Sequence, residues 1–253
     1  MNILGVRVDA VSHDQAREKV QEYMQSSGQH MIFTPNPEMI VLAQKDAYFR
    51  EVLNKGSLNL CDGKGIQMVA SDSVTRIPGV DFFLDLCALA EKNQKTMFFL
   101  GSKSLSVLEK TKENVEKKFP GLRIVGTSTG PVFPLNKNNK QAAELFEKDN
   151  EKAIDQIIAT APDILCVGFG HGKQEKWMYE FLPSLPSVRI AMGLGGSFDY
   201  VSGSIGRAPV WFQKAGFEWL WRLFRQPKRF IRIWNATVRF LWLFYFSKPK
   251  SSA

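Results

Sequence analysis

Residues 163–178 read DILCVGFGHGKQEKWM, and this stretch indicates the fold. Its apolar beginning, 163–167, predicts a buried strand, its three glycines predict a tight loop, and 173–182 predicts a helix. The same order recurs along the chain, with further strands predicted at 3–8, 31–33, 57–60, 96–100, 122–126 and 188–192. Apolar strands that alternate with helices form parallel sheets covered on both faces. The sequence therefore predicts an α/β fold with a mostly parallel sheet flanked by helices.

Polar or glycine-rich residues follow nearly every predicted strand. In sheets of this kind, ligands bind beyond the carboxyl ends of the strands, so we expect the chemistry at these loops. The loops are 34–36, 61–63, 101–102, 127–130, 168–173 and 193–197.

Asp62 and Gly63 form a dipeptide at one of these strand ends. Asp-Gly is common in ordinary turns, which is the simpler interpretation. A carboxylate at the ligand edge of a sheet is also a candidate general base. Arg76 stands in a loop before a predicted helix. It is either solvated or, if it pairs with Asp81, positioned to bind a diphosphate.

The glycine-rich loop 168–174 fits neither common nucleotide-binding template. A dinucleotide fingerprint would have glycine where Lys173 stands, and a P-loop would have Ser or Thr in place of Gln174. What is left is a turn that leads into a helix start, a geometry that suits a phosphate. His171 is interpreted as a solvated loop residue, and with three histidines in the chain no metal cluster is predicted. A second glycine-rich strand end, 193–199, is explained equally well by close chain packing.

The positive charge of the chain lies in its last forty residues. Residues 214–253 carry nine Lys or Arg against one acid, Glu218, and this difference equals the whole formal net charge of +8. Five of the six tryptophans lie from Trp211 onward. A neutral body with a basic, aromatic tail predicts a catalyst or binder that works against an anionic surface. We expect a body at 1–207 and a helical appendage at 208–253.

The appendage is predicted to contain a basic amphipathic helix. From Lys228 onward, basic and polar residues share one face and apolar residues share the other. The apolar stretch is shorter than the roughly 20 residues that span a bilayer, so we expect a helix lying in the plane of an anionic membrane surface. Packing on the body or on another subunit is the alternative, which leaves a homo-oligomer open. Nucleic acid is not an expected partner, because no binding motif is present.

Cysteine usage and the N-terminus indicate the compartment. Cys61, Cys87 and Cys166 form no C-x-x-C pair, and residues 1–8 lack the features of a secretion signal. We expect a reduced, cytoplasmic protein that associates peripherally with the inner face of the cell membrane.

Several segments together resemble the WecG/TagA/CpsF family of glycosyltransferases. The resemblance covers nearly the whole chain, and its blocks occur in order. They are TPNPEMIVLA (34–43), CDGKGIQ (61–67), TRIPGVDFF (75–83), FFLGSK (98–103), FPGLRIVGT (119–127), DILCVGFGHGKQEKWM (163–178), GLGGSFDYVSG (193–203) and RAPVWFQKAGFEWLWRLFRQPKR (207–229).

The resemblance implies a Rossmann-like sheet and inverting transfer of a sugar from a UDP-sugar to polyprenyl-diphosphate-linked N-acetylglucosamine. It implies N-acetylmannosamine as the usual sugar, a precursor of wall teichoic acid or a similar surface polymer as the product, and no cofactor or required metal. Asp62 takes the role of the base and Arg76 acts beside it on the diphosphate. The resemblance implies that Thr34, Asn36, Arg76 and Gln174 hold acceptor and donor, and that Arg222, Arg225 and Arg229 help to close the site at the membrane. Gly101 and Gly195, at two of the predicted strand ends, are further predicted substrate-binding residues.

The family usually has proline before Lys-Gln-Glu, where this chain has Gly172, and this departure leaves the choice of donor open. Transfer of glucose, galactose or N-acetylmannosaminuronate for a capsule or another surface polysaccharide is an alternative with the same chemistry. An alternative of a different class is a non-catalytic, membrane-bound UDP-sugar-binding protein.

Overall fold

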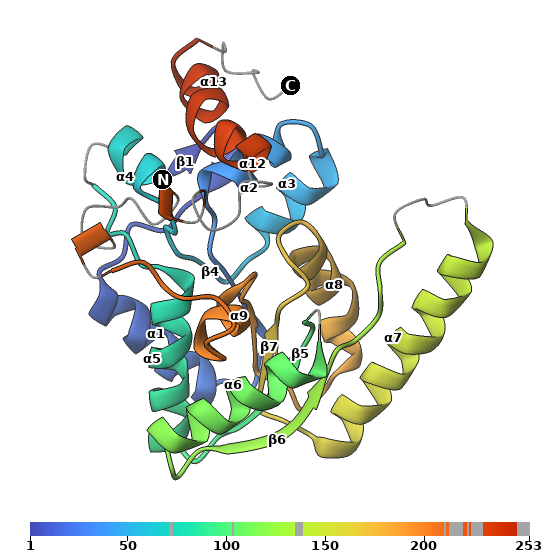
Figure 1. Cartoon of the computed structure of the whole chain (residues 1–253). Helices are drawn as coiled ribbons and strands as arrows, with labels where there is room; N and C mark the ends of the chain where they lie inside the picture. Colours follow the sequence, from blue (N-terminus) through green and yellow to red (C-terminus); the bar gives the residue numbers. More distant parts are fainter. Residues whose placement is uncertain are drawn as a thin grey trace.

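A computed structural model describes residues 1–70, 73–102, 104–134, 139–209, 211–212, 220–221, 223 and 230–246. In this part of the chain, six strands form one parallel sheet in the order β4-β3-β8-β7-β5-β6, as Figure 1 shows. The predicted α/β fold with a parallel sheet is confirmed. The strands are β3 (His30–Phe33), β4 (Leu58–Asn59), β5 (Thr96–Leu100), β6 (Arg123–Ser128), β7 (Ile164–Val167) and β8 (Ile190–Gly193).

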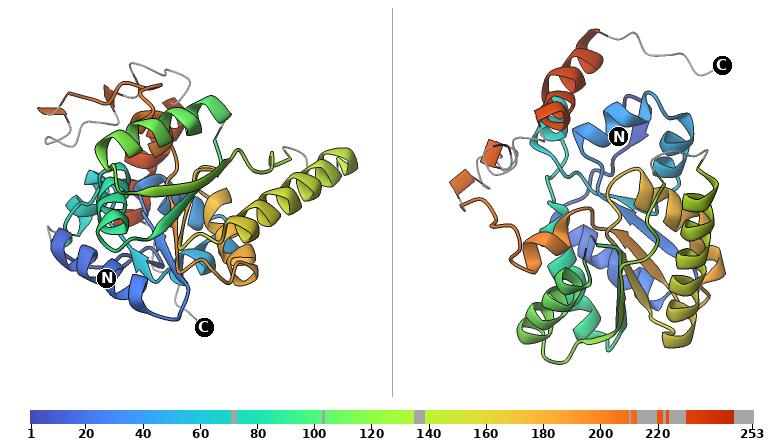
Figure 2. Two further views of the ribbon diagram at one scale, coloured as in Figure 1. Left: turned by 90° about the horizontal axis from the view of Figure 1, so that it is seen from below. Right: turned by 45° about the vertical axis from the view of Figure 1, so that its right-hand side comes forward.

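Helices cover both faces of the sheet (Figure 1, Figure 2). One face carries α1 (His13–Gln25), α5 (Gly79–Lys92), α6 (Leu105–Lys118) and α9 (Ser197–Val201). The other carries α2 (Pro37–Ala43), α3 (Ala47–Asn54), α4 (Lys64–Val69), α7 (Lys140–Thr160), α8 (Lys173–Phe181) and the 3-10 turn η1 (Leu182–Ser184). Side chains alternate along a strand, so Leu165 enters one core and Cys166 the other.

Side-chain caps explain where several helices begin. Ser12 and Gln15 form a capping box at the start of α1. Asn36 caps α2, and Asp46 caps α3 by accepting from the N–H of Phe49 at 2.9 Å. The cap at Asp46 explains why a second helix begins at Ala47 after α2 has ended at Ala43.

The N-terminus differs from the prediction of one strand at 3–8. It forms an antiparallel hairpin of β1 (Asn2–Ile3) and β2 (Val6–Arg7). Leu4 and Gly5 both have positive φ, 52° and 82°, which is typical of two-residue hairpin turns. The prediction was wrong because it gave no weight to Gly5 as a turn residue.

The C-terminal helix consists of α12 (Phe230–Trp234), the π-helical turn η3 (Asn235–Arg239) and α13 (Phe240–Phe246). It packs on α2 and α4, at the top of the view in Figure 1. Phe240 is fully buried in the same core as residues of α2, and its ring would lie 3.7 Å from a Cβ built on Gly65. No helix among the described residues is long and apolar enough to cross a bilayer.

The C-terminal helix carries polar side chains on its inward side at η3, whereas apolar side chains of α13 such as Phe240 pack against the core. Asn235 and Arg239 line a cavity of about 130 Å³ together with Glu38 of α2 and His171. Exposed apolar side chains lie on its outer side, at the helical spacings 3, 4, 4 and 3. We call this set the outer stripe: Ile231, Trp234, Val238, Trp242 and Tyr245.

Candidate active site

Four neighbouring strands end where most of the predicted site residues lie. The adjacent strands β4, β3 and β8 lead into the loops that carry Asp62, Thr34 and Gly195, respectively. The next strand, β7, leads through a glycine-rich loop to Gln174 in the first turn of α8. Neighbouring strands lie about 4.8 Å apart, so the four strand ends share an edge about 15 Å wide. The strand order thus brings together residues that are far apart in the sequence.

Asp62 and Thr34 converge at the start of α5. The N–H of Asp62 donates to the carbonyl oxygen of Pro35 at 2.9 Å, which joins the loops after β4 and β3. A Cβ built on Gly79, the first residue of α5, would lie 3.2 Å from Thr34 Oγ1 and 3.6 Å from Asp62 Oδ2. Thr34 is buried and Asp62 is half-buried. A side chain at position 79 would therefore crowd Thr34.

The first backbone amides of α5 lie beside Asp62 and Thr34. Pro78 precedes the helix, and no side chain of the described residues caps it. The first amides of a helix carry partial positive charge. Half-buried Arg76 lies just upstream. Burial raises the pKa of the Cys61 thiol to about 12, the charge of Asp62 adds to this rise and the charge of Arg76 opposes it. Both predicted catalytic charges therefore act close to Cys61.

Asp81, in the first turn of α5, pairs with Arg207. The guanidinium donates to Oδ1 at 2.5 Å and to Oδ2 at 2.8 Å, a bidentate arrangement. The sequence suggested Asp81 as a partner for Arg76, whereas the structure gives this carboxylate a bidentate pair with the last residue of the predicted body. The pair ties that end of the body to α5.

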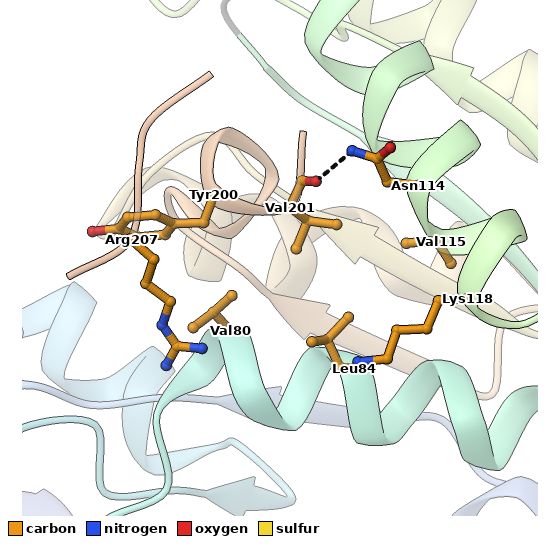
Figure 3. A pocket seen from close by; sticks show the side chains of 8 residues that line it. All are labelled: Val80, Leu84, Asn114, Val115, Lys118, Tyr200, Val201 and Arg207. Atoms are coloured by element: carbon orange, nitrogen blue, oxygen red, sulfur yellow. Dashed lines mark hydrogen bonds between the residues drawn. The ribbon is translucent and has the colours of Figure 1, made fainter. Parts of the chain in front are cut away.

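A cavity of about 260 Å³ lies beside this pair, between α5, α6 and α9 (Figure 3). Its floor is apolar, and Asn114 at its wall donates to the carbonyl oxygen of Val201 at 2.8 Å. It begins at Val80, next to Gly79, and lies on the α5 face of the sheet rather than over the strand ends. The lining residues are Val80, Leu84, Asn114, Val115, Lys118, Tyr200, Val201 and Arg207.

Asn36 has a structural contact in addition to its predicted substrate-binding role. Its Oδ1 accepts from the N–H of Met39 at 3.0 Å, which caps α2. Its backbone lies beside Gly63 and thus near Asp62, because a Cβ built on Gly63 would be 3.8 Å from Asn36 Cα. Asn36 therefore shapes the loop that borders the candidate base.

Gln174 and Glu175 form a buried network between two glycine-rich loops. The two side chains are 3% and 1% exposed. The Gln174 amide accepts from the N–H of Gly195 at 2.9 Å and donates to Glu175 Oε1 at 2.8 Å. Glu175 Oε2 accepts from the N–H of Gly172 at 2.6 Å. The network joins the loop after β7 to the loop after β8.

The start of α8 does not offer free amides to a phosphate. The N–H of Gly172 is bonded to Glu175, and those of Lys173 and Gln174 donate to the carbonyl oxygen of Gly170 at 3.3 and 3.1 Å. The carboxylate of Glu175 occupies the place where an anion would bind a helix start. The phosphate site suggested for this loop by the sequence is therefore not supported.

Gly101 lies far from Asp62 but beside the loop after β7, where the N–H of Gly168 donates to the carbonyl oxygen of Leu100 at 2.7 Å. It follows β5, four strands away from β4, which corresponds to about 19 Å. Its φ is +89°, and the ring of Phe169 lies 2.6 Å from where a Cβ would stand. Glycine is required here by this backbone conformation and by the close approach of the ring.

The arginines predicted to close the site, Arg222, Arg225 and Arg229, lie outside the described residues. Within the described residues, no three His, Cys, Asp or Glu are grouped so that they could hold a metal ion. His171, predicted as a solvated loop residue, is half-buried, and its Nε2 lies 3.6 Å from Glu38 Oε1.

Sequence reasoning missed Glu175, Gly79 and Arg207. The spacing Gly172-x-x-Glu175 is that of a capping box with glycine at its first position, and it could have identified Glu175. No local signal identifies Gly79 or Arg207, because their neighbours Thr34 and Asp81 come from distant segments.

A half-buried carboxylate beside a helix start, at the carboxyl edge of a parallel sheet, is the arrangement expected of an enzyme that activates a hydroxyl group for transfer. The whole chain, residues 1–253, matches the model of the glycosyl transferase WecG/TagA/CpsF family. The protein belongs to this family and is a glycosyltransferase.

Three bacterial relatives are each named as an N-acetylglucosaminyldiphosphoundecaprenol N-acetyl-beta-D-mannosaminyltransferase. The Bacillus spizizenii relative is 33% identical over 215 residues, which cover 83% of this chain and 77% of the relative. The Bacillus subtilis relative is 31% identical over 207 residues, which cover 80% and 74%. The Staphylococcus aureus relative is 26% identical over 244 residues, which cover 94% and 89%.

The buried Glu175 is expected to make stability depend on pH. Burial raises its pKa to about 7 from 4.5, so between these values the folded protein binds a proton that the unfolded chain does not. The free energy of unfolding should therefore fall as pH rises from 4.5 to 7, by up to about 3 kcal/mol, and then stay level. Denaturant melts of wild type and Glu175→Gln from pH 5 to 8 measure this, and parallel pH dependences in the two proteins would contradict it.

Proposed function

We propose that this protein transfers N-acetylmannosamine, with inversion, from a UDP-sugar to polyprenyl-diphosphate-linked N-acetylglucosamine. The observation that carries the proposal is the convergence of Asp62 and Thr34 on the start of α5, in a chain whose family relatives are named for this reaction. The product would serve the synthesis of wall teichoic acid or a similar surface polymer.

In the proposed reaction, Asp62 acts as the general base. Its carboxylate takes the proton from the acceptor hydroxyl as that oxygen attacks the anomeric carbon of the donor. The new carbon–oxygen bond forms on the face opposite the breaking bond to UDP, which gives inversion. An aligned general base contributes about 10²- to 10⁴-fold to the rate. Thr34, buried beside Asp62, limits how the acceptor can approach.

The leaving UDP gains charge as the bond to the sugar breaks. Arg76 and the first backbone amides of α5 supply positive charge at this position. No D-x-D motif occurs in the sequence. We therefore expect that EDTA leaves the initial rate unchanged within twofold, whereas Arg76→Ala lowers it. A rate that falls with EDTA and returns with added Mg²⁺ would contradict this role of Arg76.

The outer stripe supports contact with the membrane that carries the acceptor. It presents two tryptophans and a tyrosine to solvent on the side of the helix that faces away from the body. Amphipathic aromatic side chains of this kind favour the membrane–water interface. The basic residues of the tail add attraction to anionic lipids, at roughly 1 kcal/mol each. We therefore place the protein at the inner face of the cell membrane.

A donor panel tests the reaction. Purified protein is incubated with a short-chain lipid-diphosphate N-acetylglucosamine and, in turn, the UDP derivatives of N-acetylmannosamine, glucose, galactose and N-acetylmannosaminuronate. The proposal expects a product heavier by one N-acetylhexosamine residue and dependent on the mannosamine donor. If a product forms only with another UDP-sugar, that sugar is the one transferred and the proposal of N-acetylmannosamine is wrong. Binding of UDP without turnover on any donor would favour the non-catalytic alternative.

A further inference from the structure

The hydrogen-bond network of Glu175 lies in the middle of the active edge, the edge of the sheet where β4, β3, β8 and β7 end. It runs from the N–H of Gly172 through both oxygens of Glu175 to the side chain of Gln174, and from there to the N–H of Gly195. The strand β8 lies between β7 and β3. The loop that the network holds at Gly195 is therefore the immediate neighbour of the loop that carries Thr34.

The backbone at both ends of the network depends on it. Gly172 and Gly195 have φ values of +81° and +57°, in the left-handed region. A Cβ on Gly193 would lie 2.7 Å from Gln174 Nε2, so glycine there lets the amide lie across the end of β8. A donor shielded from water is destabilised when it loses its acceptor, so these hydrogen bonds hold the two loops together in one arrangement.

The arrangement requires an ionised carboxylate. Both oxygens of Glu175 accept from N–H donors, and a protonated oxygen would face one of these donors with its own hydrogen. Burial raises the pKa of Glu175 to about 7, against the opposing effect of these hydrogen bonds. Three pairs of titratable groups surround α8: His171 with Glu38 at 3.6 Å, Lys176 with Asp46 at 2.6 Å and Tyr48 with Glu180 at 2.7 Å. Lys173, also on α8, lies over the ring of Phe133, 5.1 Å from its centre.

We propose that Glu175 is a positioning residue for the donor: its ionised carboxylate holds the loops after β7 and β8 in the arrangement that accepts the nucleotide sugar beside Thr34. The inference rests on the proposed transfer from a UDP-sugar. Glu175 is buried and touches no substrate in this role; it acts through Gln174 and the backbone of Gly195. Protonation of the carboxylate releases one of the two loops.

Steady-state kinetics of Glu175→Ala and Glu175→Gln test the inference. Glu175→Ala should raise KM for the UDP-sugar at least tenfold and leave KM for the lipid acceptor within threefold. In the wild type, kcat/KM for the donor should fall tenfold per pH unit below about pH 7, and this dependence should be absent in Glu175→Gln. The matched control is Asn150→Ala, which removes the buried acceptor of Trp177 Nε1 on the same helix α8 but leaves the network intact.

Several outcomes would overturn the inference. One is a lowered melting temperature in Glu175→Ala with an unchanged donor KM, as expected for Asn150→Ala. Another is that kcat/KM for the donor still falls tenfold per pH unit below about pH 7 in Glu175→Gln. This result remains decisive if the alanine variant fails to fold. Amide hydrogen exchange gives a readout without substrate: Glu175→Gln should exchange faster than Asn150→Ala at one of the two glycines, Gly172 or Gly195. If the wild type binds no UDP while this exchange pattern holds, the proposed donor is wrong and the coupling of the loops stands.

Discussion

Replacing Asp62 by Asn is expected to lower turnover at least a hundredfold while leaving the fold and the affinity for UDP unchanged. Asparagine has the shape of aspartate but cannot accept the proton of the acceptor hydroxyl, and a general base contributes about 10²- to 10⁴-fold. Asp62 is half-buried at a loop, so the substitution leaves no cavity. Initial rates with the lipid acceptor, together with UDP titration calorimetry, measure the two parts of the expectation.

Asp14→Asn is the control for this experiment. Asp14 is an exposed acid in the first turn of α1, on a helix that does not contribute to the active edge. It should keep the wild-type rate. If Asp62→Asn also keeps a near-native rate, the base is another residue and the proposed mechanism fails. A loss of UDP affinity together with rate would instead place Asp62 in donor binding.

Removing the two tryptophans of the outer stripe is expected to release the protein from anionic vesicles. Trp234 and Trp242 are 52% and 57% exposed, so Trp234→Ser with Trp242→Ser should leave packing on α2 intact. A half-exposed tryptophan that enters the interface gains about 2 kcal/mol from burial of its apolar surface. We expect vesicle partitioning to fall at least tenfold in sedimentation assays, with KM for the membrane-bound acceptor rising in parallel.

The double variant Leu145→Ser with Ile158→Ser is the matched control. These residues belong to α7 and are 54% and 49% exposed. In Figure 1, α7 lies apart from the C-terminal helix. Unchanged partitioning of the tryptophan variant would refute the membrane role of the stripe. A deletion after Arg207 is a poorer test, because it also removes Phe240 from the core and uncovers α2 and α4.

Much of the architecture could be predicted from local patterns. The apolar runs predicted the strands of the parallel sheet, and the structure confirms them. The caps at Ser12, Asn36 and Asp46 likewise depend on residues a few positions apart. The hairpin at Leu4 and Gly5 was missed, although its signal is also local. The motif match likewise led to the family that the comparison with known proteins shows.

The orientation of the C-terminal helix could not be predicted in the same way. The sequence placed Asn235 and Arg239 opposite Trp234, and this amphipathic pattern was compatible with packing on the body or with lying on a membrane. In the structure the polar side faces α2, Phe240 enters the core and the outer stripe faces solvent. Periodicity along one helix defines its faces, but only the shape of the neighbouring helices decides which face is covered.

The sequence by itself determined the α/β class, the family, and the presence of Asp62 and Arg76 at loops of the ligand edge. Only the tertiary structure decided that Thr34 and Asp62 lie close to Gly79. It also decided that Gln174 accepts a hydrogen bond from Gly195 and that Arg207 pairs with Asp81. The physical reason is that strand order sets which loops become neighbours. That order depends on the pairing of β3 with β8, in which His30 lies opposite Ile190, and no local pattern of residues encodes it.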